Sequence, residues 1–177
     1  MINVYSGRPE KNSRCEIEEK VYDTLDYLGI TYERADHGPA DTIEICRNTE
    51  KYLEAHVCKN LFLTNNKRDI FCLLLMPGDK KYEAGIVSKQ LNSSRLSFAK
   101  DEDLENFLGL KRGSVSIMGL INDTKHNVTL AIDEELLRNE FLCCHPCINT
   151  STLKIRTEDI LNIFVPHTGH EIKIIQA

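Results

Sequence analysis

The chain has 177 residues, 41% of them hydrophobic, and a net charge of −5, so it can bury a core as one domain over residues 1–177 without disulfides or metal. Its seven cysteines are odd in number and irregularly spaced, which argues against a disulfide framework and favours a reducing compartment. No apolar run approaches the ~20 residues that span a bilayer, and residues 1–20 contain neither a signal core nor a transit pattern, so we expect a cytoplasmic protein without a membrane partner.

Periodicity and turn residues predict the elements of the first half. Ser13 and Glu16 have the spacing of a capping box, and apolar residues at helical intervals then predict a helix over 13–28 that Gly29 ends. The pattern further predicts a strand at 31–37, helical turns within 41–56, and strands at 57–64 and 70–76 joined by a polar turn at 65–69.

The second half alternates irregularly between helices and strands. Helices are predicted at 83–91, from Asp101 to Gly109, at 133–138, and from a capping Thr157 to Val165. Extended segments are predicted at 95–98, 115–121, 128–132, 140–144, 152–155 and 171–175. This order indicates an α/β protein with a mixed sheet on which helices pack.

The charge distribution bears on nucleic-acid binding, because phosphate contacts usually need an excess of lysine and arginine. The net charge of −5 speaks against a long duplex partner. Residues 57–95, however, carry 7 basic and 3 acidic side chains, which suits a small footprint on a few phosphates.

Three positions are candidates for chemistry. Lys59 interrupts an apolar strand, where its charge must reach either solvent or an anion, and the residue alone leaves both open. Gly113 opens a Gly-Ser turn that is either a plain turn or a source of backbone N–H groups for an oxyanion. His145 precedes Pro146, which restricts it to extended conformations, and its imidazole titrates near neutrality.

The cysteines near His145 raise the alternative of a zinc site. Cys143, Cys144, His145 and Cys147 resemble half of such a site, to which His167 and His170 would add ligands. Neighbouring residues of a strand point to opposite faces, however, and no regular Cys-x-x-Cys pair exists. The same divergence argues against a Cys144–His145 hydrolase, so burial as small apolar residues is the better interpretation.

Four separated segments together resemble the YbaK/ProX family of aminoacyl-tRNA editing domains: residues 59–63, 95–99, 113–123 and 141–152. The resemblance runs from about residue 32 to residue 172 and is closest to the ProX branch. It implies the fold of a prolyl-tRNA synthetase-associated domain, with a mixed, largely antiparallel sheet surrounded by helices. It also implies hydrolysis of mischarged tRNA(Pro), with Ala-tRNA(Pro) as the foremost substrate and no cofactor or metal. The expected partner is the 3′ end and acceptor stem of tRNA(Pro), and a prolyl-tRNA synthetase is a further candidate.

The resemblance also implies roles for individual residues. Catalytic roles fall to Lys59, which would contact a phosphate at the tRNA 3′ end, and to Gly113 and His145. Substrate binding falls to Asn60, Arg95, Ser114, Ser116, Ile117, Met118, Gly119, Asn149 and Thr150.

The chain departs from the family pattern at two of these positions. Ile117 stands where a proline is expected, and Met118 stands where ProX-like members usually have an aromatic residue. Cys-tRNA(Pro) and Ser-tRNA(Pro) therefore remain alternative substrates, and a non-catalytic module that binds tRNA or a synthetase remains an alternative function.

Overall fold

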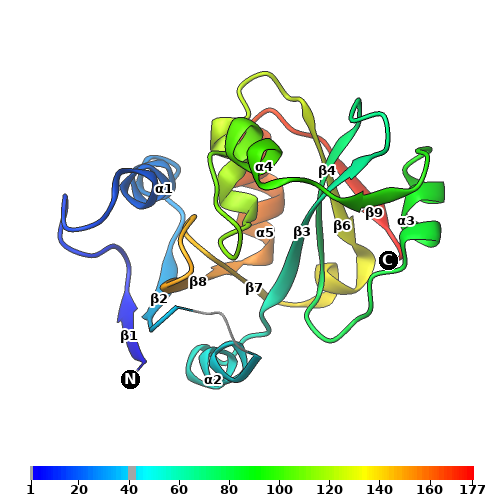
Figure 1. The fold of residues 1–177 in the computed structure, drawn as a ribbon. Helices are drawn as coiled ribbons and strands as arrows, with labels where there is room; N and C mark the ends of the chain where they lie inside the picture. The colour runs from blue at the N-terminus through cyan, green and yellow to red at the C-terminus, as the bar shows by residue number, and fades with distance from the viewer. Residues whose placement is uncertain (1, 40–42) are drawn as a thin grey trace.

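The computed structural model describes residues 2–39 and 43–177, and its strands form two sheets that lie side by side (Figure 1). The first sheet is antiparallel throughout and has the order β1-β2-β8-β7. Its strands are β1 (Asn3–Ser6), β2 (Tyr32–Asp36), β7 (Phe141–Cys144) and β8 (Ser151–Arg156).

The second sheet is mixed and has the order β5-β3-β4-β6-β9. Its strands are β3 (Cys58–Asn65), β4 (Phe71–Pro77), β5 (Leu96–Phe98), β6 (Val128–Asp133) and β9 (Ile172–Ile175). Strand β3 pairs antiparallel with β4 and β5, whereas β6 runs parallel to both β4 and β9. Residues 71–76 of β4 are all buried, which explains why this central strand reads as an unbroken apolar run.

An isolated parallel bridge between Val57 and Cys143 joins the two sheets. The Sγ of Cys58 also donates a 3.2 Å hydrogen bond to the carbonyl of Cys143. Because the bridge is parallel, the two chains leave it in the same direction: one continues into Lys59 and the other into His145. Chains paired in this way lie about 4.8 Å apart at the bridge, so the junction brings together segments that the sequence separates widely.

Most helical segments pack on the face that both sheets turn toward the main core. They are α1 (Glu16–Tyr27), α4 (Asp101–Leu108), the 3-10 helix η1 (Ile117–Asn122) and the continuous segment α5 (Thr157–Asp159), η3 (Ile160–Phe164) and α6 (Val165–His167). Helix α3 (Ala84–Gln90) covers the other face of the mixed sheet through Val87. Helix α2 (Ile43–Leu53) covers the outer face of the antiparallel sheet, where Leu53 contacts Ala35 and Cys143. A short 3-10 helix, η2 (Glu134–Arg138), follows β6.

The predicted mixed α/β architecture is confirmed, and three local predictions are wrong. Residues 117–121 of the predicted 115–121 strand belong to η1, whose N-cap is Ser116, with its Oγ accepting from the Met118 N–H at 3.2 Å. The first four residues of that segment are all buried, so its periodicity could not distinguish a strand from a helix. The predicted capping box of Ser13 and Glu16 does not form. The N-cap of α1 is Cys15, whose side chain makes no capping hydrogen bond. Thr157 is the first helical residue and not the cap, since its hydroxyl donates to the carbonyl of Asn139 at 2.6 Å.

Helix α2 confirms the helical turns predicted within 41–56, although residues 41 and 42 lie outside the described part. Within the part of the chain that the structure describes, no helix combines the length and the apolar character that a membrane crossing demands.

Candidate functional site

His145 lies just beyond the end of β7, half-buried at the junction of the two sheets. Its Nδ1 is 2.8 Å from the carbonyl oxygen of Ser151, and a carbonyl only accepts, so Nδ1 carries the proton and Nε2 of the neutral ring keeps its lone pair. Burial lowers the pKa of His145 below its ordinary value, and the hydrogen bond to Ser151 opposes this only in part. The imidazole is therefore neutral at pH 7 and can accept a proton through Nε2.

A second histidine, His37, faces His145 from the end of β2. The two ring centroids are 6.3 Å apart, and the buried His37 ring places Nε2 2.8 Å from the hydroxyl of Thr152. The His37 amide also donates to the carbonyl of Thr150 at 3.0 Å. The sequence alone does not indicate His37, because its proximity to His145 depends on the pairing of β2 with β8. The only local signal was its position at the end of a strand before Gly38.

The loop that carries Gly113 is fastened to His145 through Ser116. The fully buried Ser116 hydroxyl donates a 2.6 Å hydrogen bond to the carbonyl of His145. The Ser114 hydroxyl is likewise occupied, since it donates to the carbonyl of Lys111 at 2.8 Å. Both hydroxyls, which the sequence suggested for substrate binding, are engaged in holding the loop in place.

Gly113 occupies a turn with a φ of 86°, a left-handed conformation that strains any residue with a Cβ. The following amide, that of Ser114, donates to the carbonyl of Lys111 and is not available to a ligand. The amides on either side, those of Gly113 and Val115, donate to no acceptor among the described residues. The turn can therefore offer two backbone N–H groups to an oxygen.

Lys59 and Asn60 leave the bridge on β3 and point to opposite faces of the strand. The half-buried Lys59 ammonium donates to the backbone carbonyl of Lys80 at 2.7 Å, not to a carboxylate, so its charge is not neutralised there. The Oδ1 of Asn60 is buried and has no hydrogen-bond partner among the described residues. An orphan acceptor of this kind is costly and suits an N–H or O–H donor of a ligand.

The remaining predicted residues fall into two groups. Ile117 and Met118 are fully buried in the main core, and a Cβ on Gly119 would lie 2.7 Å from Cδ1 of Leu110, so these three positions pack η1 tightly. Asn149 and Thr150 lie on the half-buried connection that follows His145.

Arg95, in contrast, is exposed beside the far end of β3 and is not brought to this site. The next residue, Leu96, pairs with Asn65, and the six positions from Lys59 to Asn65 span about 20 Å of strand.

The cysteines around His145 are buried as predicted, with Cys143 and Cys144 in different core clusters on opposite faces of β7. Burial raises the pKa of Cys58 to about 11, that of Cys147 to about 12, and that of Cys144 well above its ordinary value. These thiols are therefore protonated at neutral pH. Among the side chains that the structure describes, those of residues 2–39 and 48–177, no three from His, Cys, Asp or Glu are grouped so that they could hold a metal ion.

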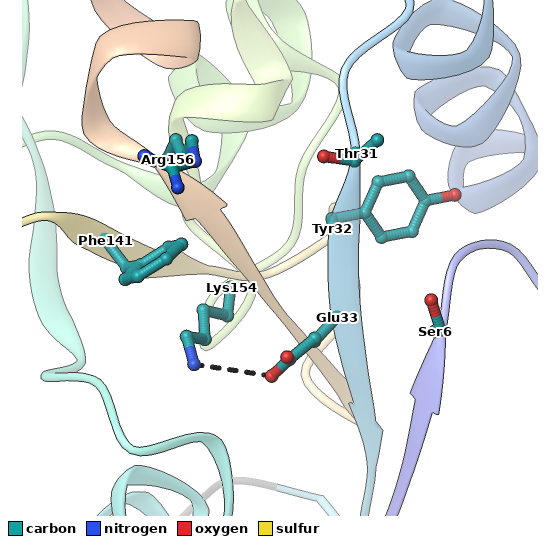
Figure 2. Close-up of a pocket in the computed structure, with 7 residues that line it drawn as sticks. All are labelled: Ser6, Thr31, Tyr32, Glu33, Phe141, Lys154 and Arg156. Atoms are coloured by element: carbon teal, nitrogen blue, oxygen red, sulfur yellow. Dashed lines mark hydrogen bonds and ion pairs between the residues drawn. The ribbon is translucent and has the colours of Figure 1, made fainter.

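Two surface hollows lie elsewhere. One, of about 230 Å³, is on the outer face of the antiparallel sheet, where Lys154 points toward Glu33 at 3.4 Å beside Phe141 and Arg156 (Figure 2). The other, of about 340 Å³, lies beside η1 and is partly lined by His126 and His167. Neither hollow includes a predicted site residue among its lining residues.

Comparison with known proteins identifies the family of the chain. A family model described as an aminoacyl-tRNA editing domain matches residues 37–163. The prolyl-tRNA editing protein ProX of Acetoanaerobium sticklandii is 30% identical over 161 residues, which cover 91% of this chain and 98% of that protein. The prolyl-tRNA synthetase associated domain-containing protein 1 of Danio rerio is 29% identical over 157 residues, 88% of this chain and 84% of that protein.

A solved structure described as a candidate trans-editing enzyme for prolyl tRNA synthetase shares the fold. Its TM-score is 0.69 at 16% identity, with 93% of this chain and 99% of that chain covered. The breadth of the family match, together with the ProX relative, shows that the chain belongs to the aminoacyl-tRNA editing domain family.

Proposed function

We propose that the protein is a trans-editing hydrolase that cleaves the ester between a wrong amino acid, foremost alanine, and tRNA(Pro). The parallel bridge between Val57 and Cys143 is the observation that carries this proposal. It sets Lys59 and Asn60 on one chain beside His145 on the other, and these are the residues to which the family resemblance gives roles. Lys59 has its charge available for a phosphate, and Asn60 presents an acceptor that lacks a donor.

The chemistry needs few groups because an aminoacyl ester is already activated. A water positioned near Nε2 of His145 attacks the carbonyl carbon while Nε2 takes one of its protons. The ester C–O bond of the tetrahedral intermediate then breaks, and that proton passes to the departing ribose oxygen through the neighbouring ribose hydroxyl, which gives up its own proton as it accepts one. The amides of Gly113 and Val115 donate to the oxyanion, and one such donor typically contributes ~2.7–4 kcal/mol of transition-state stabilisation. No step requires a metal or a thiolate.

Selectivity in this proposal is steric. Ile117 and Met118 have no exposed surface of their own, so in this proposal they act from beneath, by fixing the backbone of η1 against which the amino-acid side chain would lie. A pocket that admits a methyl group excludes the pyrrolidine ring of proline, whereas a smaller intruder loses only ~1–3 kcal/mol for each missing methylene. Arg95 has no role in this pocket, because it lies about 20 Å away along β3.

The partners in this proposal are the 3′ end and acceptor stem of tRNA(Pro), in the cytoplasm, with a prolyl-tRNA synthetase holding the complex together. Six of the seven basic side chains of residues 57–95 divide between the two ends of the β3–β4 hairpin, and the seventh, Lys89, lies on α3. Lys59, Lys80 and Lys81 are at one end, and Lys67, Arg68 and Arg95 are at the other. That separation makes a broad RNA footprint improbable on electrostatic grounds and favours contact at the 3′ end alone.

Deacylation of a panel of tRNA(Pro) charged with alanine, cysteine, serine or proline tests the proposal. We expect release of alanine at the highest rate and no release of proline beyond the spontaneous rate. Release of cysteine or serine in preference to alanine would show that the protein is a deacylase whose substrate is Cys-tRNA(Pro) or Ser-tRNA(Pro). Tight binding of every charged tRNA without any hydrolysis would instead make the protein a binding module.

A further inference from the structure

The start of β8 is held by a polar cluster that lies behind His145. Asp36 is paired with Ser151 across the β2–β8 ladder. The Asp36 carboxylate accepts from the Ser151 hydroxyl at 3.1 Å, from Nε of Arg34 at 3.0 Å and from a guanidinium nitrogen of Arg14 at 2.6 Å. All four polar groups are therefore fixed relative to one another.

Burial alone would raise the pKa of Asp36, but the hydrogen bonds from Arg34 and Arg14 outweigh it and hold that pKa below its ordinary value. The carboxylate is therefore ionised throughout the neutral range. An ionised acceptor makes the bond to the Ser151 hydroxyl a charge-assisted one, which is stronger and geometrically more restrictive than a neutral bond.

Ser151 connects this cluster to His145 through a different atom. Its side chain binds Asp36, while its backbone carbonyl accepts from Nδ1 of His145 at 2.8 Å. Ser151 is fully buried, and Arg34 is almost so, which leaves little room for the carbonyl to turn. The position of one carbonyl oxygen thus depends on a carboxylate on the neighbouring strand.

We infer that Asp36 and Ser151 are positioning residues, which fix the orientation and the Nδ1–H tautomer of His145 so that Nε2 faces the substrate with its lone pair. The orientation and tautomer of His145 are independent of the proposed function. Only the statement that Nε2 faces a substrate rests on it. Arg14, Arg34 and Asp36 all precede residue 37, where the family match begins, so the N-terminal part of the chain completes the site.

The tautomer of His145 can be observed without any enzymatic assay, by ¹⁵N NMR of the imidazole in the full chain. Free histidine in water prefers the proton on Nε2, and the partner of one ring nitrogen decides which tautomer a protein holds. We expect the Nδ1–H form alone in the native protein and a mixture with the Nε2–H form in Ser151→Ala and Asp36→Asn. Ser97→Ala removes an exposed strand serine and is the matched control.

Kinetics provide the second readout. A misoriented base affects the chemical step, so we expect kcat for Ala-tRNA(Pro) to fall between about 10-fold and 100-fold in Ser151→Ala with KM unchanged. Arg14 is partly exposed, so Arg14→Ala should fold and lose less activity, and Arg14→Lys should restore part of it.

The outcomes separate the inference from the proposed function. Unchanged ¹⁵N shifts of His145 in both Ser151→Ala and Asp36→Asn would overturn the inference, even if activity fell, because the effect would then be structural. If the native protein hydrolyses no charged tRNA, the proposed function fails while the NMR measurement still decides the positioning role. If Asp36→Asn does not fold, Ser151→Ala and Arg14→Ala decide it.

Discussion

The hydroxyl of Ser116 donates a 2.6 Å hydrogen bond to the backbone carbonyl of His145. The same oxygen accepts the Met118 N–H, so a single buried hydroxyl holds both the start of η1 and the end of β7. The turn at Gly113 and the imidazole of His145 consequently keep a fixed separation. A site that stabilises an oxyanion depends on such constancy, because its donors must already be in place when charge develops.

Replacement of Lys59 should separate activity from stability. Lys59→Ala loses the proposed phosphate contact and one bond to a backbone carbonyl, so deacylation should fall strongly while the melting temperature changes little. Lys59→Glu should be slower still, because it adds repulsion toward phosphate. Deacylation rates and thermal melts measure the two effects, with Lys67→Ala, an exposed lysine at the other end of the β3–β4 hairpin, as the control. Near-native activity in Lys59→Ala would remove this residue from the site.

A side chain at Gly113 should damage catalysis for every substrate. With φ at 86°, Gly113→Ala pays roughly 1–2 kcal/mol for a left-handed backbone or moves the turn. Movement of the turn to relieve this strain displaces the amides of Gly113 and Val115, so kcat should drop for Ala-, Cys- and Ser-tRNA(Pro) alike. Gly85→Ala, in the open first turn of α3, is the control. A variant that changes substrate preference but spares the rate on Ala-tRNA(Pro) would contradict the oxyanion role.

The pH dependence should reflect the lowered pKa of His145. Its neutral form persists below pH 6.5, so kcat, corrected for spontaneous hydrolysis, should stay level through pH 6.5 and fall only at lower pH. Stability follows the same direction: the unfolded state binds the proton first, so the free energy of unfolding decreases as pH drops from about 6.5 through the lowered folded pKa. His145→Gln should lack this component in a urea titration repeated across pH. If kcat instead falls with decreasing pH at a midpoint above pH 7, the imidazole of His145 is not the neutral group described here.

Met118→Phe should cost stability as well as alter preference. Met118 is fully buried, and extra atoms in a close-packed core typically destabilise a protein by about 1–3 kcal/mol. Urea titration should show a decrease of this size in the free energy of unfolding. Displacement of η1 toward the pocket should then favour alanine over cysteine and serine. Met118→Leu, which nearly conserves volume, should change neither quantity appreciably. Complete loss of activity in a folded Met118→Phe protein would show that the residue does more than shape the pocket.

Sequence patterns recovered elements whose signals are local. Gly109 ends α4 in a left-handed conformation, and the long apolar run of β4 is buried on both faces, as such a run predicts. The prediction for η1 was wrong because its first four residues are all buried, which removes the alternation that distinguishes a strand from a helix. His37 was missed for another reason: only the pairing of β2 with β8 brings it to His145, and no local pattern encodes that pairing. Ser116 was predicted to bind substrate, whereas its hydroxyl donates to the carbonyl of His145. That acceptor is distant in sequence, so no local pattern indicates the bond.

The bridge between Val57 and Cys143 also determines when the site comes into being during folding. Cys58 and Cys143, which share its hydrogen bond, are 85 residues apart, so the closure of this junction carries a large chain-entropy cost. The β3–β4 hairpin, in contrast, closes across a short turn and forms early. Intermediates with both sheets intact but unjoined would hold Lys59 and His145 on separate units, without a place for substrate. In the proposed function, hydrolysis therefore requires this long-range junction, because neither sheet alone carries both Lys59 and His145.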